Sequence, residues 1–231
     1  MPALIVTIDG PGGVGKSTAA KLLAKRLGIM YLDTGATYRA LAYAALQRKL
    51  SPVTDVEPLT QLARTLPLRL VPMVEGALAV ILEGRDVTKE IRTERVSEAA
   101  AQLSQHPAVR EAMVELQRRL AAQQGVVVEG RDTGSVVFPN ATHKFFLEAD
   151  PTVRAQRRQR ELGKLYGAEP PLAEVQEQLE FRDGLDRNRR VGPLVKPAEA
   201  VVIDTSRLTT EQVVAAMLEH VTGGRSQGVA G

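Results

Sequence analysis

The stretch with the clearest chemistry is residues 10–17, which read Gly-Pro-Gly-Gly-Val-Gly-Lys-Ser. It matches G-x-x-x-x-G-K-S, in which glycines allow positive φ angles and backbone N–H groups converge on phosphate oxygens. Lys16 would act as a catalytic lysine at the terminal phosphates, and the Ser17 hydroxyl would ligate Mg²⁺. We therefore expect an ATP cradle, formed by Gly10, Pro11, Gly12, Gly13, Val14, Gly15, Lys16, Ser17 and Thr18.

The flanks of this loop are those that a phosphate-binding loop (P-loop) requires. The apolar run 3–8 precedes it, and residues 20–27 carry four apolar side chains at helical spacing. Gly28 stands where a helix C-terminal cap belongs. Because a strand, the loop and a helix follow one another, a merely glycine-rich turn is the weaker interpretation.

A P-loop alone does not distinguish kinases from GTPases or motor ATPases. The guanine-reading patterns N-K-x-D and T-K-x-D are absent, because Thr88 and Lys89 are followed by Glu90 and Ile91. The chain is also short for a helicase or a transporter ATPase. A kinase that phosphorylates a small molecule becomes the leading class.

The apolar run 29–32 leads directly into residues that could bind the phosphoryl acceptor. The carboxyl ends of strands form the ligand-binding edge of open α/β sheets. Arg39 could clamp a phosphate in a bidentate manner, and Thr34 could donate its hydroxyl to the acceptor. In the structural alternative, Asp33 caps a helix and Tyr38 lines the core.

The apolar run 126–128 also ends in charged residues. Glu129 occupies a position where P-loop proteins often keep an acid that binds Mg²⁺, directly or through water. Arg131 and Asp132 could bind the phosphate and the base of the acceptor. The alternative is a surface ion pair between these two residues.

Arginines form two clusters towards the C-terminal end of the sequence. They are Arg154, Arg157 and Arg158 in the first cluster and Arg182, Arg187, Arg189 and Arg190 in the second. The segment 163–171 between them suits a hinge. Phosphoryl transfer spreads negative charge over the migrating group, and arginines brought in by closure of a lid would stabilise it and exclude water. The alternative is a solvated helix face whose charge nearby glutamates balance.

The composition excludes several classes of protein. Of the 231 residues 44% are hydrophobic, which is enough for a core, and only 3% are aromatic, which is poor for stacking nucleic-acid bases. The net charge of +3 fits small phosphorylated partners, so we expect no nucleic-acid partner. There is no cysteine, which fits a reducing compartment, and no apolar run reaches the length of a membrane span. We expect a cytoplasmic enzyme.

Short apolar runs alternate with helical segments, the pattern of parallel strands joined by crossover helices. The expected strands are 3–8, 29–32, 126–128, 144–147 and 200–203. The sequence therefore predicts an α/β fold with a five-stranded parallel sheet flanked by helices. The last helix should begin at a capping box formed by Thr209 and Gln212.

Residues 33–125, between the second and third strands, are far more than a crossover needs, so an insertion is expected. It should contain a hairpin, 66–73 with 77–82 around a turn at 74–76, and helices near 96–103 and 107–120. The expected division is a core of 1–60, 107–150 and 191–222, an acceptor-binding insertion of about 61–106, a helical lid of about 151–190 and a flexible tail of 223–231.

With these residues assembled, the chain resembles the bacterial cytidylate kinase family over residues 4–221. The resemblance rests on I-D-G-P-G-G-V-G-K-S at 8–17, L-D-T-G-A-T-Y-R at 32–39, E-I-R-T at 90–93, V-R at 109–110, E-G-R-D-T-G-S-V-V-F-P at 129–139 and R-D-G-L-D-R-N-R at 182–189. It implies a P-loop nucleoside monophosphate kinase fold, and transfer from MgATP to CMP or dCMP to give ADP and CDP or dCDP.

The resemblance also implies roles for individual residues. Arg39, Arg131 and Arg189 would hold the acceptor phosphate, Asp186 the ribose hydroxyls, and Arg110 with Asp132 the cytosine, with Thr34 and Tyr38 completing this site. Arg157 and Arg182 would be catalytic arginines at the transferring group. A phosphate monoester is already ionised at neutral pH, so the reaction needs no general base.

One departure concerns the base site. Relatives often carry, at the place of Ala101, a serine whose hydroxyl contributes to base recognition. Either Gln102 or Thr34 compensates, or discrimination between CMP and UMP is looser than usual.

Two alternatives to a CMP kinase remain. One is another small P-loop kinase that acts on UMP or AMP, although no G-F-P-R motif of adenylate kinases follows the third strand. The other is a non-catalytic, nucleic-acid-binding P-loop module. A monomer is the default expectation.

Overall fold

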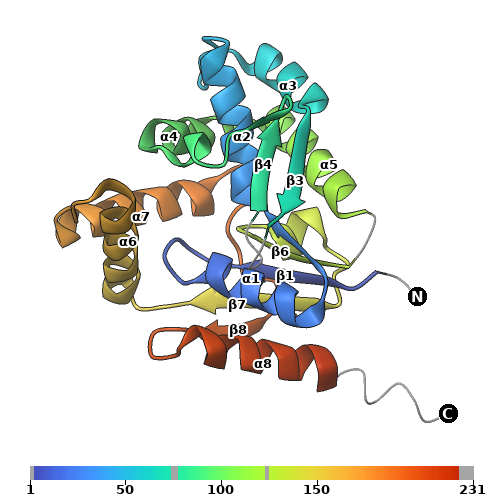
Figure 1. The fold of residues 1–231 in the computed structure, drawn as a ribbon, viewed down its shortest axis with the longest axis vertical. Helices are drawn as coiled ribbons and strands as arrows, with labels where there is room; N and C mark the ends of the chain where they lie inside the picture. Colours follow the sequence, from blue (N-terminus) through green and yellow to red (C-terminus); the bar gives the residue numbers. More distant parts are fainter. Residues whose placement is uncertain (1–2, 74–77, 123–124, 224–231) are drawn as a thin grey trace.

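The computed structural model describes residues 3–73, 78–122 and 125–223, and within them it contains a parallel sheet of five strands (Figure 1). From one edge to the other the strands are β2 (Met30–Asp33), β6 (Val126–Gly130), β1 (Ile5–Asp9), β7 (His143–Glu148) and β8 (Val201–Asp204). Each expected strand is confirmed, with its ends shifted by at most a residue or two. β1 lies in the centre, and the P-loop follows it.

Helices cover both faces of the sheet. Helices α1 (Lys16–Leu27) and α8 (Thr210–Gly223) contact each other and share a buried cluster with Val127 of β6. The residues on either side, Val126 and Val128, belong to a different cluster, which includes Leu32. Because successive strand residues point to opposite faces, this alternation explains why β6 is apolar throughout.

The expected helix caps are present. The helix after the P-loop ends at Gly28, which has φ 65° and donates its N–H to the carbonyls of Ala24 and Lys25. Before α8, the N–H of Thr209 donates to Gln212 Oε1 at 2.9 Å, and the N–H of Gln212 donates to Thr209 Oγ1 at 3.3 Å. These reciprocal bonds confirm the predicted capping box.

A second body lies above the parallel sheet in Figure 1. Its elements are α2 (Thr34–Gln47), α3 (Val56–Thr65), β3 (Leu68–Pro72), β4 (Leu78–Leu82), β5 (Arg85–Asp86), the 3₁₀ helix η2 (Glu90–Arg92), α4 (Glu94–Leu103) and α5 (Pro107–Ala121). β3 and β4 are antiparallel, which confirms the predicted pairing, whereas its turn at 74–76 lies outside the described residues. The short strand β5 was not expected.

The buried cluster of this second body runs through α2, α3, α4 and α5 and includes Leu41, Leu59, Leu103 and Met113. Helices on both sides of the expected insertion boundaries at 60 and 107 therefore share one apolar core. The division into core and insertion stays a prediction.

The arginine clusters lie on two helices that pack against each other, α6 (Pro151–Tyr166) and α7 (Leu172–Asn188), and we call this pair the lid helices. Ala155, Val175 and Leu179 are buried between them. The expected start of the hinge at Gly163 is wrong, because α6 continues for three residues beyond it and is capped by Gly167 at φ 79°.

At the C-terminal end, α8 runs to Gly223, and the rest of the expected tail lies outside the described residues. Between residues 3 and 223, with the two gaps given above, no helix is both long and apolar enough to cross a membrane.

The η3 segment (Thr133–Val137) follows β6 and forms a π-helical turn beside β1.

Candidate active site

The P-loop forms the floor of a cleft with two halves. We call them the donor half, a cavity of about 680 Å³ beside α6 and α8, and the acceptor half, a cavity of about 400 Å³ beside α2, α4 and α7. Residues Lys16 and Ser17 line both halves. The two halves therefore adjoin at the lysine and serine of the loop.

Lys16 is buried at this junction. Its Nζ donates to the carbonyl of Pro11 at 2.6 Å. Burial is the main cause that lowers the pKa of Lys16, to about 7, and repulsion from Arg131 is the second. The negative charges of Glu129, Asp183 and Asp9 oppose this shift. A triphosphate in the loop would add negative charge beside this ammonium group and favour its protonated form.

Besides Lys16, the donor half contains Arg157, which the resemblance placed at the transferring group. Arg157 donates to Thr205 Oγ1 at 3.0 Å and to the Thr205 carbonyl at 2.6 Å, in the turn after β8. It lines the donor half together with Arg160 and Lys164. Among the described residues it is not part of the acceptor half, which Arg158 of the same helix reaches.

The acceptor half brings together all eight residues predicted to bind the acceptor. They are Thr34, Tyr38, Arg39, Arg110, Arg131, Asp132, Asp186 and Arg189, and the predicted catalytic residue Arg182 joins them. They come from α2, α5, the turn after β6, and α7 with its C-terminal end, which are far apart in the sequence.

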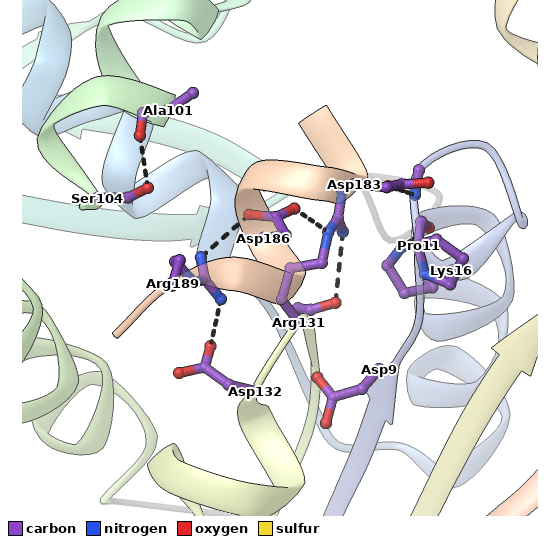
Figure 2. A network of polar contacts seen from close by, with 12 residues as sticks. Asp9, Pro11, Lys16, Ala101, Ser104, Arg131, Asp132, Asp183, Asp186 and Arg189 are labelled. Atoms are coloured by element: carbon purple, nitrogen blue, oxygen red, sulfur yellow. Dashed lines mark hydrogen bonds and ion pairs between the residues drawn. The ribbon is translucent and has the colours of Figure 1, made fainter. Parts of the chain in front are cut away.

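Carboxylates pair with the arginines of this half (Figure 2). Arg131 Nε lies 2.8 Å from Asp186 Oδ2, and Arg189 Nη1 lies 3.1 Å from Asp186 Oδ1. Burial alone would raise the pKa of Asp186, but Arg131 and Arg189 outweigh it and hold that pKa below its usual value. Asp186 therefore carries its negative charge at neutral pH and holds both guanidinium groups in place.

The inner end of the acceptor half holds buried donors that lack partners. Arg110, whose side chain is 2% exposed, pairs with Asp132, yet its Nε and Nη1 have no hydrogen-bond partner within the described parts of the chain. The Tyr38 hydroxyl is likewise buried without a partner there, and burial raises its pKa to about 12. The guanidinium of Arg110 lies 5.6 Å from the centre of the Tyr38 ring. Unsatisfied buried donors are costly, so these groups indicate a polar ligand.

The sequence left two interpretations open for this segment, a helix cap at Asp33 and a phosphate contact by Arg39, and the geometry accommodates both. Asp33 caps α2 by accepting the N–H of Ala36 at 2.8 Å, and its second oxygen lies 3.0 Å from Arg39 Nη2. Burial pulls the pKa of Asp33 upward, but Arg39 and the Ala36 amide lower it overall. The helix cap thus also orients an arginine of the cleft, whose Nε is buried without a partner among the described residues.

The residues expected at a metal ion lie beside each other. The Ser17 hydroxyl lies close enough to Glu129 to favour its charged form, and the Tyr31 hydroxyl donates to Glu129 Oε1 at 2.5 Å. Burial and the charge of Asp33 raise the pKa of Glu129, against the attraction of Lys16. The described residues contain no cluster of three or more His, Cys, Asp or Glu side chains that could hold a metal. One hydroxyl and one carboxylate fit Mg²⁺, which takes its other ligands from phosphates and water.

Known proteins resemble the chain over most of its length. The model of the cytidylate kinase family matches residues 6–223. The chain belongs to the cytidylate kinase family. It is 46% identical over 225 residues to the cytidylate kinase of Pelotomaculum thermopropionicum, which covers 96% of this chain and 97% of that relative. It is 45% identical over 219 residues to the cytidylate kinase of Klebsiella pneumoniae, which covers 94% of both.

Among solved structures, an uncharacterised protein from Eubacterium ventriosum has a TM-score of 0.53 and 12% identity, and the match covers 96% of this chain and 99% of that one. This likeness concerns the fold alone. Membership of the cytidylate kinase family confirms the resemblance and the kinase class that the sequence indicated. The rival acceptors and the nucleic-acid-binding module are not favoured.

The sequence did not indicate the role of Asp9, which supports this cytidylate kinase site. Asp9 accepts three hydrogen bonds, from Thr133 N at 2.9 Å, Thr133 Oγ1 at 2.8 Å and Gly134 N at 2.8 Å. It thereby ties the end of β1 to the turn that carries Arg131 and Asp132. The aspartate between Ile8 and the P-loop was part of the quoted motif, but no local pattern indicated which distant amides it would accept.

The surroundings of Ala101 also differ from expectation. Gln102, a suggested substitute for the missing hydroxyl, lines a groove beside the lid helices and is not among the described residues that line the acceptor half. Thr34 lines the acceptor half but donates its hydroxyl proton to the Glu129 carbonyl at 2.7 Å. Ser104 does line the acceptor half, and it donates to the Ala101 carbonyl at 2.8 Å (Figure 2).

Proposed function

We propose that this chain transfers the γ-phosphoryl group of ATP to CMP and to dCMP, giving ADP with CDP or dCDP. The observation that carries the proposal is an acceptor half lined with paired arginines and aspartates that opens directly onto Lys16 and Ser17 of the P-loop. Its relatives named cytidylate kinase support the choice of CMP.

The acceptor phosphate would bind to Arg39, Arg131 and Arg189. Each of these arginines already lies against a carboxylate, so a phosphate that arrives must share or displace Asp33 or Asp186. Charge-assisted hydrogen bonds of this kind contribute about 1.5–3 kcal/mol each. The phosphate is thus held at a fixed place beside the loop rather than in a loose cationic patch.

The rest of the nucleotide would fill the polar inner end. The unpartnered nitrogens of Arg110 and the Tyr38 hydroxyl, together with Asp132, offer donors and an acceptor to the edge of a cytosine. Asp186 would accept from the ribose hydroxyls, which makes it a residue that distinguishes CMP from dCMP. Thr34 supplies a further hydroxyl oxygen to the same pocket.

In the reaction an oxygen of the acceptor phosphate attacks the γ-phosphorus, and the bond from that phosphorus to the leaving oxygen of ADP breaks. Lys16 and Arg182 would stabilise the negative charge on the transferring group. The acceptor oxygen is already ionised, so no side chain has to remove a proton. Ser17, with Glu129 directly or through water, would hold Mg²⁺, which neutralises phosphate charge when bound.

Arg157 would act differently from the role that the resemblance implied. Its bonds to Thr205 and its place in the donor half support a contact with the donor nucleotide rather than with the transferring group. We also propose that the enzyme works as a cytoplasmic monomer, and the absence of cysteine fits a reducing compartment.

The test is to identify the product. The purified chain is incubated with MgATP and CMP, and nucleotides are separated by anion-exchange chromatography. We expect ADP and CDP in equal amounts, and the same for dCMP with dCDP. ADP released with inorganic phosphate in place of CDP would show an ATPase and overturn the proposal.

A further inference from the structure

The lid helices contact the P-loop at the backbone of Gly12. The N–H of Gly12 donates to Asp183 Oδ1 at 2.9 Å, and its carbonyl accepts from Arg154 Nη1 at 3.1 Å. Arg154 also forms an ion pair with the second oxygen of Asp183. Asp183 lies on α7 and Arg154 on α6, so each lid helix holds the same residue of the loop. Figure 2 shows Asp183 directly beside the loop.

This contact is shielded from water. The side chains of Asp183 and Arg154 are 1% and 7% exposed, so neither charge can be compensated by solvent. Removal of one partner would leave the other as an uncompensated buried charge. Such an arrangement persists only when the surrounding structure holds both groups in one geometry.

The loop is shaped to accept the lid helices. The pattern G-x-x-x-x-G-K-S leaves the positions of Gly12 and Gly13 open, so phosphate binding alone does not demand glycine there. A Cβ at position 13 would lie 2.8 Å from the backbone oxygen of Arg154, and φ is 76° at this residue. A Cβ at position 12 would lie 2.8 Å from Cδ2 of the buried Leu179. Both glycines are therefore explained by the close approach of the lid helices.

Asp183 also fixes the rotation and height of α7 relative to the P-loop. Arg182 is its neighbour in the sequence, and Asp186 lies one helical turn further on. Both residues line the acceptor half. A displacement of Asp183 from Gly12 would therefore move the acceptor residues of α7 with respect to the donor phosphates.

We propose that Asp183 and Arg154 are positioning residues, which anchor the lid helices to Gly12 and thereby set the distance between the donor and acceptor phosphates. The proposal rests on the kinase activity proposed above. It adds Asp183, which the sequence did not indicate, and it gives Arg154, predicted to stabilise the transferring group, a positioning role instead. Misplacement of reacting groups by about 1 Å can cost about 100-fold in rate.

The decisive experiment separates positioning from simple stabilisation. The double variant Asp183→Leu with Arg154→Met replaces the buried ion pair by apolar side chains, a change that is often neutral for folding. We expect a melting temperature close to that of the wild type and a kcat with CMP lowered by about 100-fold. A kcat of the double variant within about threefold of the wild-type value would overturn the proposal, because that difference is smaller than a typical hydrogen bond contributes.

Two single variants keep the test informative if the double variant does not fold. Asp183→Asn keeps an oxygen that can accept the Gly12 N–H, whereas Asp183→Ser loses the charge and is too short to reach it. We expect kcat to be about tenfold higher for the Asn variant, in line with one buried hydrogen bond. Equal kcat values would contradict the anchor. Glu199→Gln, which weakens the pair between Lys144 and Glu199 outside the cleft, serves as the control and should leave kcat unchanged.

Hydrogen exchange separates failure of this proposal from failure of the proposed function. In the Asp183→Ser variant, amides of peptides that cover residues 10–18 should exchange faster than in the wild type, whether or not CMP is the acceptor. Unchanged exchange in this segment would overturn the anchor. If the wild type does not phosphorylate CMP but exchange rises in the variant, the proposed function fails and the anchor stands.

Discussion

The donor and acceptor halves of the cleft are built in different ways. The donor phosphates would meet backbone amides and one lysine within residues 10–18, a single strand, loop and helix. Half of the residues that line the acceptor half are charged, and those predicted to bind the acceptor come from the separate stretches 34–39, 110, 131–132 and 186–189. The first site exists wherever the local backbone conformation forms, whereas the second exists only after the chain has folded.

The two halves also differ in how their charges are balanced. Lys16 is a single buried cation whose pKa burial lowers to about 7. In the acceptor half, by contrast, Asp186 pairs with both Arg131 and Arg189, and Asp132 pairs with Arg110. Paired arginines stay in place before the substrate arrives, and substitutions within this network should not be additive. Substitution of one residue should therefore disable the donor half, whereas successive substitutions should weaken acceptor binding in steps.

The largest expected effect is that of Lys16→Ala, which removes the lysine of the P-loop, buried where the two halves meet. Loss of a group that stabilises the charge of the transition state should lower kcat by about 10² to 10³-fold. CMP binding, measured by calorimetry in the absence of ATP, should change little. Lys25→Ala, at an exposed lysine on the same helix, is the control. Near-normal turnover of the Lys16 variant would remove the basis for the P-loop assignment.

Arg131→Met should affect the acceptor half alone. The loss of a charge-assisted contact, about 1.5–3 kcal/mol, lowers kcat/KM for CMP by about 10- to 100-fold and leaves ADP affinity unchanged. Arg187→Met, at an exposed arginine of α7, is the matched control. Weaker ADP binding with an unchanged KM for CMP would show that Arg131 acts in the donor half and not in the acceptor half.

Arg157→Met sharpens the boundary between the halves. Because Arg157 bonds to Thr205 in the donor half, we expect the KM for ATP to rise about fivefold while the KM for CMP stays constant. Steady-state kinetics with each substrate varied in turn gives both constants. A fall in kcat with an unchanged KM for ATP would instead indicate that Arg157 contacts the transferring group, as the resemblance implied.

The smallest effect is expected for Ala101→Ser in the base site. A new hydroxyl that bonds to the base would add about 0.5–1.5 kcal/mol and raise the preference for CMP over UMP by about 2- to 10-fold. Gln102→Ser adds the same hydroxyl on the neighbouring groove and should leave the preference unchanged. If both variants behave alike, position 101 does not face the base.

The sequence predicted the parts of the fold that depend on short-range patterns. Apolar runs marked the five strands, and Gly28, Thr209 and Gln212 marked helix ends through bonds that span a few residues. The order of the strands was not predicted, since an apolar face shows that a strand is buried but not which strand lies beside it. The short strand β5 has two exposed residues and hence no apolar signal.

The same distinction between short-range and long-range signals applies to the candidate site. The P-loop is contiguous and could be identified from spacing. Acceptor residues that directly follow predicted strands, such as Arg39 and Arg131, could be proposed from that position. The acceptor roles of Arg110, Asp186 and Arg189 could be assigned only through the resemblance to a family. The bond from Gly12 to Asp183 joins residues 171 positions apart, and nothing in either local sequence indicates it. The direction of Arg157 likewise depends on the turn after β8, which brings Thr205 within reach.

The central claim is that the acceptor half selects a cytosine monophosphate. Its most direct test measures ADP release with MgATP against CMP, dCMP, UMP, AMP, GMP and no acceptor, compared as kcat/KM. The account predicts that CMP and dCMP exceed AMP and GMP by at least about 100-fold, the discrimination of two or more buried hydrogen bonds. Equal or higher kcat/KM for AMP or GMP, or ADP release that does not depend on an acceptor, would contradict it.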